Sequence, residues 1–521
     1  MPVFSRHAPN VKSLWKCRAL TMACATAAVP STRLSKGQSP DCSRTAANAR
    51  KSISTERRVS LSDLKGKEAE LREIAAKYGQ DHIFRFWDQL NDAGRAALLS
   101  DLAQVDFALM RRLAEQWILS QPPPETFRHI EPVPVIPVDA PDAREAWDAG
   151  EEALRAGRVG LFLVAGGQGT RLGFDGPKGA YPIGPITGRT LFAYHADKIH
   201  NLQRRYGCAL PWYIMVSDAN ANATETFFAE NNYFDLDPDN AHFLRQRVVP
   251  CMDAQGRFML EAPGRLAVNP NGHGGCIPAM VENGVLDDAR NRGVDLLSYF
   301  QVDNWAVKVA DPRFIGYHVL RNAEMSSKNH YKNHVREAVG VHCLCDGEYR
   351  VIEYSELDLY PQLLETDADG NVRYFAGNPA IHIISTAFVQ RIYDIFDQFP
   401  WHLAHKRIPF INEAGERIEP ASPNGYKFET FVFDALRFVK HPPVAVGIER
   451  EGEYTPIKQF EGENSVVAAR RSMASLWSKW LDAAGSPVPR DAEGICAIQL
   501  EISPRFALTQ EEFVAKSAGR R

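Results

Sequence analysis

Apolar residues recur every three or four positions over residues 61–118, which predicts a series of amphipathic helices. The period is carried by Leu71, Ile74, Ile83, Phe86, Leu90, Leu98, Leu102, Phe107 and Leu113. Gly79 and Asn91 interrupt it, so we expect the helices to break at these two residues. Residues 122–141 contain seven prolines and predict an extended connection, after which helix resumes over residues 142–156.

From residue 158 onward, the pattern changes to short apolar runs that alternate with helical stretches. The apolar runs cover residues 160–165, 212–217, 296–302 and 444–448. The helix candidates between them cover residues 193–206, 224–230 and 277–292. Runs that are apolar on both faces are typical of parallel strands covered by helices on both sides. The alternation therefore predicts an α/β fold with a doubly wound, mostly parallel sheet.

Four segments are expected along the chain. They are an extension at residues 1–60, a helical N-terminal region at 61–157, an α/β domain at 158–464 and a small C-terminal region at 465–521. Within the C-terminal region, the pattern predicts an amphipathic helix through Trp477 and Trp480. A short strand-rich tail over residues 494–502 is expected after it.

The extension at residues 1–60 differs from the rest of the chain in charge. It holds eleven Lys and Arg residues against two acidic ones, a net charge of +9, so residues 61–521 carry −13. The segment has no helical or strand periodicity. Disorder, an organellar targeting peptide and a start of translation further along the chain are all compatible with this composition.

Composition argues against some classes of protein. The net charge of −4 over 521 residues gives no electrostatic case for nucleic acid as a partner. No apolar run reaches the length of a membrane-spanning helix, so no membrane partner is expected. The nine cysteines contain no C-x-x-C pair, so we expect reduced, mostly buried thiols in a cytoplasmic protein.

A glycine-rich loop follows the apolar run at residues 160–165. Glycine occupies four of the eight positions 166–173. Without Cβ atoms, such a loop lets backbone N–H groups approach phosphate oxygens closely. Arg171 adds a bidentate fork and Lys178 a point charge, which suit an α-phosphorus whose negative charge grows during transfer. The segment predicts a nucleoside triphosphate site, and a structural turn with incidental charges is the alternative.

Two well-known phosphate-binding loops do not fit this spacing. Leu172 stands where the dinucleotide-binding fingerprint has its third glycine. Gly179 follows Lys178, whereas the Walker motif places Ser or Thr after its lysine. A dinucleotide-dependent oxidoreductase is therefore disfavoured.

Asp303 directly follows the apolar run at residues 296–302. In open α/β sheets, ligands bind beyond the carboxyl ends of the strands. A carboxylate at this place is well positioned to hold Mg²⁺ (or Mn²⁺) that bridges phosphates. A helix-capping aspartate is the alternative.

The glycine-rich loop and Asp303 belong to an ordered set of motifs. The set comprises FWDQL at 86–90, LVAGGQGTRLG at 163–173 with PKG at 177–179, WYIMVS at 212–217, PNGHGG at 270–275, VDN at 302–304, VKVADP at 307–312, EYSE at 353–356, PNGYK at 423–427, FVFD at 431–434 and YTPIK at 454–458. In this order the chain resembles the eukaryotic-type UDP-sugar pyrophosphorylases, and among them the UDP-N-acetylglucosamine pyrophosphorylases. The resemblance spans residues 80–515 and implies a GT-A-like nucleotidyltransferase fold for the α/β domain.

The resemblance also implies a role for each matching residue. Nucleotide-binding roles fall on Gly166, Gly167, Gly169, Thr170, Gln246, Gly272 and His273. Sugar-binding roles fall on His273, Gly340, Glu353, Asn378, Phe431 and Phe433. Catalytic roles fall on Arg171, Lys178 and Lys458, and the metal-binding role falls on Asp303.

Some of these residues have ordinary alternatives. Gln246 is expected to read the uracil edge, because an amide can donate and accept at once, as uracil's N3–H and carbonyls require. An exposed polar side chain is the alternative there. Phe431 and Phe433, judged alone, are as typical of a core as of a ligand contact, and Lys458 is typical of a surface. Their roles therefore rest on the resemblance.

Three positions depart from the family pattern. Asn271 stands where vertebrate-like members carry Asp, and His273 stands where they carry an Asn that contacts the sugar. A histidine also bonds hydroxyl groups, but its bulk leaves the sugar preference open, and a structural histidine in a tight loop is the alternative. Tyr331 replaces an acidic residue, and nothing in the sequence explains the effect.

The expected activity is that of a uridylyltransferase. UTP and N-acetylglucosamine 1-phosphate are the expected substrates, with UDP-N-acetylglucosamine and pyrophosphate as products of a Mg²⁺-dependent in-line transfer. The alternatives are a UDP-glucose, UDP-galactose or broad-range UDP-sugar pyrophosphorylase and, from another class, a nucleotide-binding regulator without activity. The sequence leaves a monomer and a homo-oligomer equally open.

Overall fold

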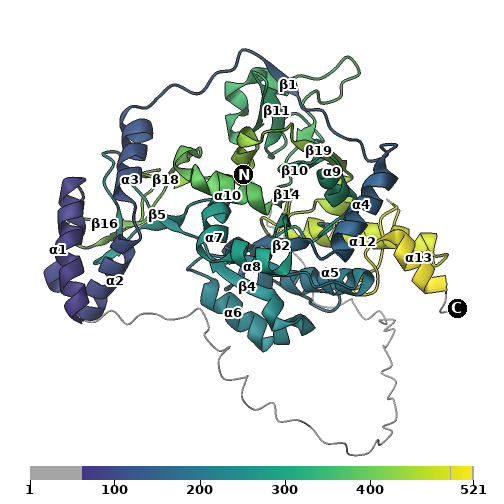
Figure 1. Ribbon diagram of the computed structural model, residues 1–521, viewed down its shortest axis with the longest axis horizontal. Coiled ribbons are helices and arrows are strands. Elements are labelled where there is room, and N and C mark those ends of the chain that lie inside the picture. Colours follow the sequence, from purple (N-terminus) through teal and green to yellow (C-terminus); the bar gives the residue numbers. More distant parts are fainter. Residues whose placement is uncertain (1–60, 493, 519–521) are drawn as a thin grey trace, which may run out of the picture. The chain divides into compact units, whose positions relative to one another are not determined.

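A sheet of eleven strands organises the computed structural model, which describes residues 61–492 and 494–518. The extension predicted at residues 1–60 lies outside the described residues. The strand order is β1-β11-β13-β10-β14-β9-β2-β3-β4, with β12 paired to β11 and β19 paired to β10 (Figure 1). The strands that carry the expected nucleotide loop and Asp303 are neighbours in this order.

The half of the sheet that follows β14 in this order is parallel. Its strands are β9 (Leu296–Gln301), β2 (Val159–Val164), β3 (Trp212–Val216) and β4 (Ala241–Arg245). Val164 of β2 pairs with Gln301 of β9, so the two strands end at the same level. The segments that follow them therefore leave the sheet side by side. The predicted α/β class with a doubly wound sheet is confirmed in this half.

The other half is largely antiparallel and was not anticipated. Its strands are β1 (Ile130–Pro132), β10 (Met325–Tyr331), β11 (Val341–Cys345), β12 (Glu348–Ile352), β13 (Ala376–Gly377) and β14 (His382–Ser385), with β19 (Val444–Ile448) parallel to β10. Strand β10 reads MSSKNHY, which has neither an apolar run nor apolar–polar alternation. Only its pairing with three neighbours makes it a strand.

Helices cover both faces of the sheet, because alternate strand residues are apolar on both sides. In β2, Leu161 and Leu163 point into one core and Phe162 into the other. The first core contains α4 (Ala143–Arg155), α5 (Leu191–Tyr206), α6 (Ala221–Glu230), α9 (Pro312–Leu320), α12 (Val466–Ala483) and α13 (Gln510–Ala518). The second contains α7 (Cys276–Glu282), α8 (Val285–Arg292) and α10 (Thr386–Asp394).

Two sequence expectations are wrong in detail. The helix expected over residues 277–292 is divided into α7 and α8, because Gly284 adopts a left-handed conformation with φ +74°. The strand-rich tail expected over residues 494–502 contains no strand. Helix α13 follows instead, and its Phe513 packs against Trp480 of α12. Apolar side chains of the tail pack against the first core, but no neighbouring strand pairs with its backbone, so no strand forms there.

Residues 81–90, which were expected to be helical, form only two 3-10 turns, whereas three α-helices form where they were expected. They are α1 (Leu61–Lys77), α2 (Asp92–Ala103) and α3 (Phe107–Leu113). The breaks fall at Gly79, which is left-handed, and at Asn91, whose side chain caps α2 by accepting from the N–H of Gly94 at 2.9 Å. The proline-rich connection runs extended along the sheet, where Ile136 bridges to Val446.

A third core joins these helices to short strand pairs. The pairs are β5 (Val248–Pro250) with β8 (Val268–Pro270), β6 (Leu260–Ala262) with β7 (Arg265–Leu266), β15 (His402–Lys406) with β18 (Gly425–Glu429), and β16 (Phe410–Ile411) with β17 (Arg417–Ile418). One further short helix, α11 (Arg450–Glu453), follows β19. No helix of the described residues is long and apolar enough to cross a membrane.

Candidate active site

The glycine-rich loop is held from one side by the segment that follows β3. Ser217 donates its hydroxyl to the carbonyl of Gly166 at 2.9 Å, and Asn220 donates to the carbonyls of Ala165 at 2.8 Å and Gly167 at 3.2 Å. In a trans peptide the N–H points opposite to the carbonyl. The N–H groups after these three carbonyls therefore point away from Ser217 and Asn220.

Ser217 and Asn220 are residues that the sequence reasoning missed. Among the described residues, the N–H groups of Gly166 and Gly167 make no hydrogen bond, so they are free to donate to a ligand. The signal that points to Ser217 is its place. It ends an apolar run next to the run that carries the loop, and parallel neighbours end at one edge of a sheet.

Asp303 lies between the two predicted lysines. The Oδ2 atom of Asp303 is 3.3 Å from the Nζ atom of Lys178 and 3.1 Å from the Nζ atom of Lys458. Burial raises the pKa of Asp303, but the two ammonium groups outweigh it and hold the pKa at about 2. The charge of Asp303 in turn raises the pKa of Lys458. Asp303 is therefore ionised at neutral pH, and its single carboxylate faces two lysine side chains.

A backbone clasp joins the Asp303 segment to the segment that carries Lys458. The N–H of Ile457 donates to the carbonyl of Asp303 at 3.0 Å. Asn304 donates to the carbonyl of Glu453 at 2.7 Å and accepts from the N–H of Thr455 at 3.0 Å. The side chain of Lys458 is half exposed, so packing restrains it little. The hydrogen bonds of this clasp, more than packing, fix the backbone position of Lys458.

A divalent cation fits this site only together with a phosphate ligand. Among residues 61–492 and 494–518, no group of three or more His, Cys, Asp or Glu side chains is arranged to hold a metal. Mg²⁺ is commonly bound by one or two carboxylates, with substrate phosphates and water completing its octahedron. Asp303 suits the role of single protein ligand, because both lysines approach its carboxylate at Oδ2.

Gln246 lies beside the glycine-rich loop. Its Oε1 atom is 3.5 Å from the position that a Cβ on Gly166 would occupy. Its Nε2 atom donates to Oδ1 of Asn271 at 3.0 Å and to the carbonyl of Gly272. The donor half of the amide is therefore used within the protein. Oε1 is left to accept from a group such as the N3–H of uracil.

Gly272 is required by its surroundings. Its φ of +84° is in the left-handed region, and a Cβ there would lie 2.2 Å from the carbonyl oxygen of Thr430. The N–H of Thr430 in turn donates to the carbonyl of Asn271 at 2.7 Å. The PNGHGG segment and the strand end at Thr430 are thus in direct backbone contact, which brings His273 next to Phe431.

His273 and the two predicted phenylalanines form an aromatic wall. The ring of His273 stacks on Phe431 at 5.1 Å and lies 5.5 Å from Phe433. The N–H of Val432 donates to Nδ1 of His273 at 3.1 Å. Burial, with Lys458 and His402 nearby, lowers the pKa of His273 to about 3. His273 is therefore neutral, and its Nε2–H is a fixed donor.

His402 and Asp434 extend this wall and were not foreseen from the sequence. The ring of His402 stacks on Phe431 at 4.3 Å, and its Nε2 atom is 2.8 Å from Oδ2 of Asp434. Burial opposes protonation, but the Asp434 carboxylate outweighs it and raises the pKa of His402. Nothing in the sequence near residue 402 signals this contact, because the two residues are 32 positions apart.

The remaining sugar-site residues meet at the end of β12. The N–H of Asn378 donates to the carbonyl of Gly340 at 2.8 Å. A Cβ on Gly340 would lie 2.7 Å from Oε1 of Glu353, so the carboxylate rests against this glycine. Burial and the nearby Glu356 raise the pKa of Glu353 to about 7, although His402 and Lys458 lower it. Lys458 thus lies close enough to influence both this group and Asp303.

Two residues stand apart from this arrangement. Arg171 and its neighbour Thr170 are exposed, and Arg171 has no ion pair within the part of the chain that the structure describes. Arg171 therefore shares the loop but not the contact between Lys178 and Asp303. Tyr331 stacks on Phe375 at 5.0 Å and pairs with Ala376 of β13.

The sequence profile of one family, described as UTP–glucose-1-phosphate uridylyltransferase, matches residues 124–473, about two thirds of the chain. The chain belongs to this family. A human relative, UDP-N-acetylhexosamine pyrophosphorylase-like protein 1 from Homo sapiens, is 34% identical over 490 residues, which cover 87% of this chain and 95% of the human one. UDP-N-acetylglucosamine diphosphorylase 2 from Arabidopsis thaliana is 33% identical, over 85% of this chain and 90% of the plant protein.

The uridylyltransferase family assignment agrees with similarity to solved structures. The crystal structure of the uridine diphosphate N-acetylglucosamine pyrophosphorylase from Trypanosoma brucei, in complex with an inhibitor, has a TM-score of 0.73 and 26% identity. The match covers 87% of this chain and 96% of that chain. The crystal structure of a putative UDP-N-acetylglucosamine pyrophosphorylase from Entamoeba histolytica has a TM-score of 0.68 and 29% identity, over 74% and 97% of the two chains.

Proposed function

We propose that this chain transfers the uridylyl group of UTP to N-acetylglucosamine 1-phosphate and releases pyrophosphate. The observation that carries the proposal is the charge group at the ends of β2 and β9, in which Lys178 and Lys458 flank Asp303. This group lies at the same edge of the sheet as the glycine-rich loop, because β2 and β9 end at the same level. Such an arrangement is suited to a polyphosphate.

The chemistry requires alignment and charge neutralisation more than proton transfer. An oxygen of the sugar 1-phosphate attacks the α-phosphorus, and the bond from that phosphorus to the bridging oxygen of the β-phosphate breaks. Pyrophosphate leaves with that oxygen and its electron pair. A phosphate monoester has its second pKa near 6, so the nucleophile is already an anion at neutral pH. No general base is needed.

Each group of the site has a part in this transfer. The loop N–H groups and Lys178 hold the triphosphate, and Lys458 lies between the Asp303 side and the Glu353 side, where it can hold the incoming phosphate. When bound with the nucleotide at Asp303, Mg²⁺ or Mn²⁺ supplies further neutralisation of phosphate charge. Arg171 is exposed on the loop, from where it can add a bidentate contact once a phosphate is present.

The choice of N-acetylglucosamine 1-phosphate as the sugar substrate rests on the relatives and on the aromatic wall described above. The human and plant relatives carry N-acetylhexosamine or N-acetylglucosamine in their names. The stacked rings of His273, Phe431 and Phe433 offer an apolar surface to an acetamido methyl group. Glu353 and the Nε2–H of His273 supply an acceptor and a donor for hydroxyl groups.

A second candidate substrate is glucose 1-phosphate. The family profile carries the name of the glucose enzyme. In addition, the ring of His273 lies beside the predicted sugar-binding residues, at the position where related proteins carry the smaller side chain of an asparagine. A sugar that lacks the acetamido group leaves more room beside this ring. His273 is therefore the residue at which this second candidate differs most from the first.

The deciding experiment is pyrophosphate release from UTP with a panel of sugar 1-phosphates and Mg²⁺. We expect kcat/KM for N-acetylglucosamine 1-phosphate to exceed that for glucose 1-phosphate about tenfold or more, as a filled acetamido pocket requires. Higher kcat/KM with glucose 1-phosphate would give the function to the second candidate. UTP binding without pyrophosphate release from any sugar would indicate a regulator instead of an enzyme.

We further propose a cytoplasmic location. All six cysteines of the described residues carry free thiols, including the neighbours Cys343 and Cys345 on β11. Reduced cysteines are typical of the cytosol. Fractionation of cells that express the tagged full-length chain tests this proposal, and enrichment with an organelle would contradict it.

A further inference from the structure

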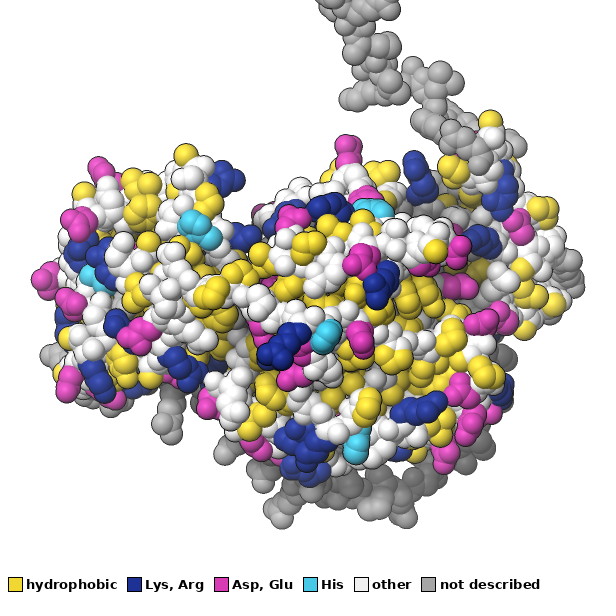
Figure 2. Space-filling model, turned by 90° about the horizontal axis from the view of Figure 1, so that it is seen from above, with side chains coloured by type: hydrophobic (Ala, Val, Ile, Leu, Met, Phe, Trp, Pro, Cys, Tyr) yellow, Lys and Arg dark blue, Asp and Glu magenta, His cyan; other side chains and the backbone are white. Residues whose placement is uncertain are grey.

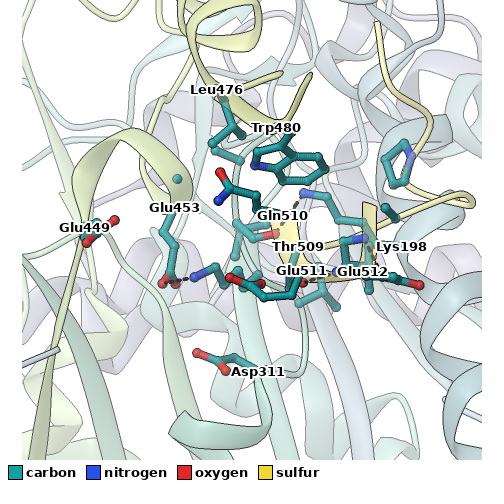
Figure 3. Close-up of a pocket in the computed structure, with 18 of the residues that line it drawn as sticks. Lys198, Asp311, Glu449, Glu453, Leu476, Trp480, Thr509, Gln510, Glu511 and Glu512 are labelled. Carbon is teal, nitrogen blue, oxygen red and sulfur yellow. Dashed lines mark hydrogen bonds and ion pairs between the residues drawn. The ribbon is translucent and has the colours of Figure 1, made fainter. Parts of the chain in front are cut away.

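A cavity of about 850 Å³ lies behind the segment that follows Asp303. It is lined by α4, α5, α11, α12, the C-terminal segment and residues 305–309, and Asp303 itself does not line it. Figure 3 shows Lys198 reaching into this region from α5, across from Glu453. The Asp303 segment therefore has the candidate active site on one side and this cavity on the other.

Lys198 bonds directly to the segment behind Asp303. Its Nζ atom donates to the carbonyl of Val307 at 2.8 Å and to the carbonyl of Trp305. One turn earlier on α5, Nε2 of His195 is 3.1 Å from the carbonyl of Val302. Helix α5 thus holds the segment by its backbone on both sides of Asp303.

We propose that Lys198 is a positioning residue that holds the Asp303 segment where Mg²⁺ and the nucleotide phosphates bind. The inference rests on the proposed function, because it assigns Lys198 to the same uridylyl transfer. Lys198 lines the cavity, which Asp303 does not, and its Nζ atom donates to two backbone carbonyls of the segment between them. It acts through the position of Asp303, which the clasp to Glu453 and Thr455 holds from the opposite side.

A stabilising role in the core does not explain this lysine. Lys198 is 8% exposed, and none of its hydrogen bonds goes to a carboxylate. Removing an ammonium group from water is costly, and an apolar side chain of similar length would avoid that cost. The adjoining cavity also means that the side chain is not closely packed on every side. What lysine adds over an apolar residue is a pair of strong donors aimed at the Asp303 segment.

The test uses Lys198→Met in the full-length chain, with Lys479→Met as the matched control. Methionine keeps the length and apolar stem of lysine and removes its donors. Lys479 lines the same cavity from α12, but it pairs with Glu451 and makes no contact with the Asp303 segment. The first measurement is Mn²⁺ binding in the presence of UTP, by electron paramagnetic resonance. The second is pyrophosphate release at increasing Mg²⁺.

Lys198→Met should weaken Mn²⁺ binding and raise the Mg²⁺ concentration for half-maximal activity about 10- to 100-fold, as loss of a residue that orients a metal ligand does. Lys479→Met should change both by less than about twofold, and both variants should melt as folded proteins. Wild-type Mn²⁺ binding in folded Lys198→Met would overturn the proposal. If Lys198→Met does not fold, Lys198→Gln, which keeps a donor, is measured in its place. Failure of both variants to fold would make Lys198 a fold residue and would also overturn it.

Failure of this inference is distinguishable from failure of the proposed function. If the wild-type chain and Lys479→Met release no pyrophosphate with any sugar 1-phosphate, the proposed function fails. The Mn²⁺ measurement with UTP then decides the role of Lys198 by itself. If both release pyrophosphate and Lys198→Met binds Mn²⁺ normally, only the inference fails.

Discussion

Two ammonium groups share one carboxylate oxygen at the centre of the candidate site. In such a group, Asp303 balances only one of the two lysines, so the site carries an excess of positive charge. That excess attracts polyphosphate, and a divalent cation at Asp303 is favoured only when phosphate charges accompany it. The individual residues thus explain why the nucleotide and the metal are expected to bind together.

Replacing either lysine is expected to reduce turnover strongly. Lys178→Met or Lys458→Met should lower kcat for pyrophosphate release about 100-fold, because each removes one preorganised charge from the transferring phosphate. Lys77→Met, an exposed lysine on α1, should leave kcat unchanged. Steady-state kinetics of the three variants check this prediction. Activity within twofold of the wild type in both site variants would remove the lysines from the mechanism.

Glu353 should make stability depend on pH. Its pKa is about 7 in the folded chain against an ordinary value of 4.5. Between these values the folded state holds a proton that the unfolded chain has released, so the free energy of unfolding falls as pH rises through this window. Glu353→Gln should therefore stabilise the chain by about 1–2 kcal/mol at pH 8 and by nothing near pH 4.

Urea unfolding of Glu353→Gln and the wild type at the two pH values tests this expectation. Glu145→Gln, an exposed glutamate on α4, serves as the control and should show no such difference. Because Glu353 is also expected to bind sugar hydroxyls, KM for the sugar 1-phosphate should rise in the same variant. Equal stability differences at both pH values would contradict the assigned burial of this carboxyl group.

At the scale of elements, the glycine-rich loop depends on the neighbouring strand. Ser217 and Asn220, which follow β3, hold three carbonyls of the loop segment from one side, and the N–H of Lys178 also donates to the carbonyl of Gly167 at 3.0 Å. Asn220 is almost fully buried and also accepts from the N–H of Ser217 at 3.0 Å. The loop's shape is therefore a property of the β2–β3 pair.

Asn220→Ala should loosen the loop. It leaves the carbonyl of Ala165 without a donor and the carbonyl of Gly167 with only the N–H of Lys178, at a cost of about 1–3 kcal/mol if the backbone does not move to water. We expect KM for UTP to rise about tenfold. Asn231 follows α6, and its side chain donates an exposed hydrogen bond to the carbonyl of Phe227. Asn231→Ala removes this hydrogen bond and should have no effect on KM for UTP. A normal KM for UTP in Asn220→Ala would show that the loop keeps its conformation without Asn220.

Helices α4 and α9 also approach each other very closely. A Cβ on Gly316 of α9 would lie 1.5 Å from the carbonyl oxygen of Ala146 in α4. Gly316→Ala should therefore destabilise the fold by about 1–3 kcal/mol through forced separation of the helices. Gly452→Ala, where nothing lies within 4 Å of the new methyl group, should be neutral or slightly stabilising. Thermal unfolding distinguishes the two, and equal melting temperatures would contradict the close contact.

At the scale of the whole molecule, charge is unevenly distributed along the chain but mixed over the face that Figure 2 draws. Figure 2 shows acidic and basic side chains interspersed over the face it draws, without a broad area of one sign. The net −13 of residues 61–521 contrasts with the +9 of residues 1–60. All contacts that build the candidate site lie between Ala165 and Lys458.

Removal of residues 1–59 should therefore leave catalysis unchanged. We expect kcat and both KM values of the shortened chain to stay within about twofold of the full-length values, because no described site contact involves that segment. The shortened chain should bind an anion-exchange resin more strongly, since its net charge is more negative. A large loss of activity without unfolding would give the extension a part in the site.

Local sequence patterns were enough to predict the class of fold, the place of the glycine-rich loop and the identity of the charged residues beside it. Apolar runs such as that of β2 fix strands in a sheet covered on both faces, and glycines in the loop are readable because they are local requirements of the backbone. The strand-poor C-terminal tail and the division between α7 and α8 were missed, since strand formation needs a partner and a single left-handed Gly284 ends a helix.

Which charged groups meet, and whether each titratable group is protonated, depends on the tertiary structure. Lys178 and Lys458 are 280 positions apart, and the pairing of β2 with β9 and the clasp at Asn304 bring them to one oxygen of Asp303. Burial and neighbours distant in the chain also lower the pKa of His273 and raise that of Glu353. The contacts of Asn220, His402 and Lys198 likewise join residues that are far apart in the sequence. Composition does not encode such proximity, because electrostatic shifts depend on distances and desolvation that exist only after folding.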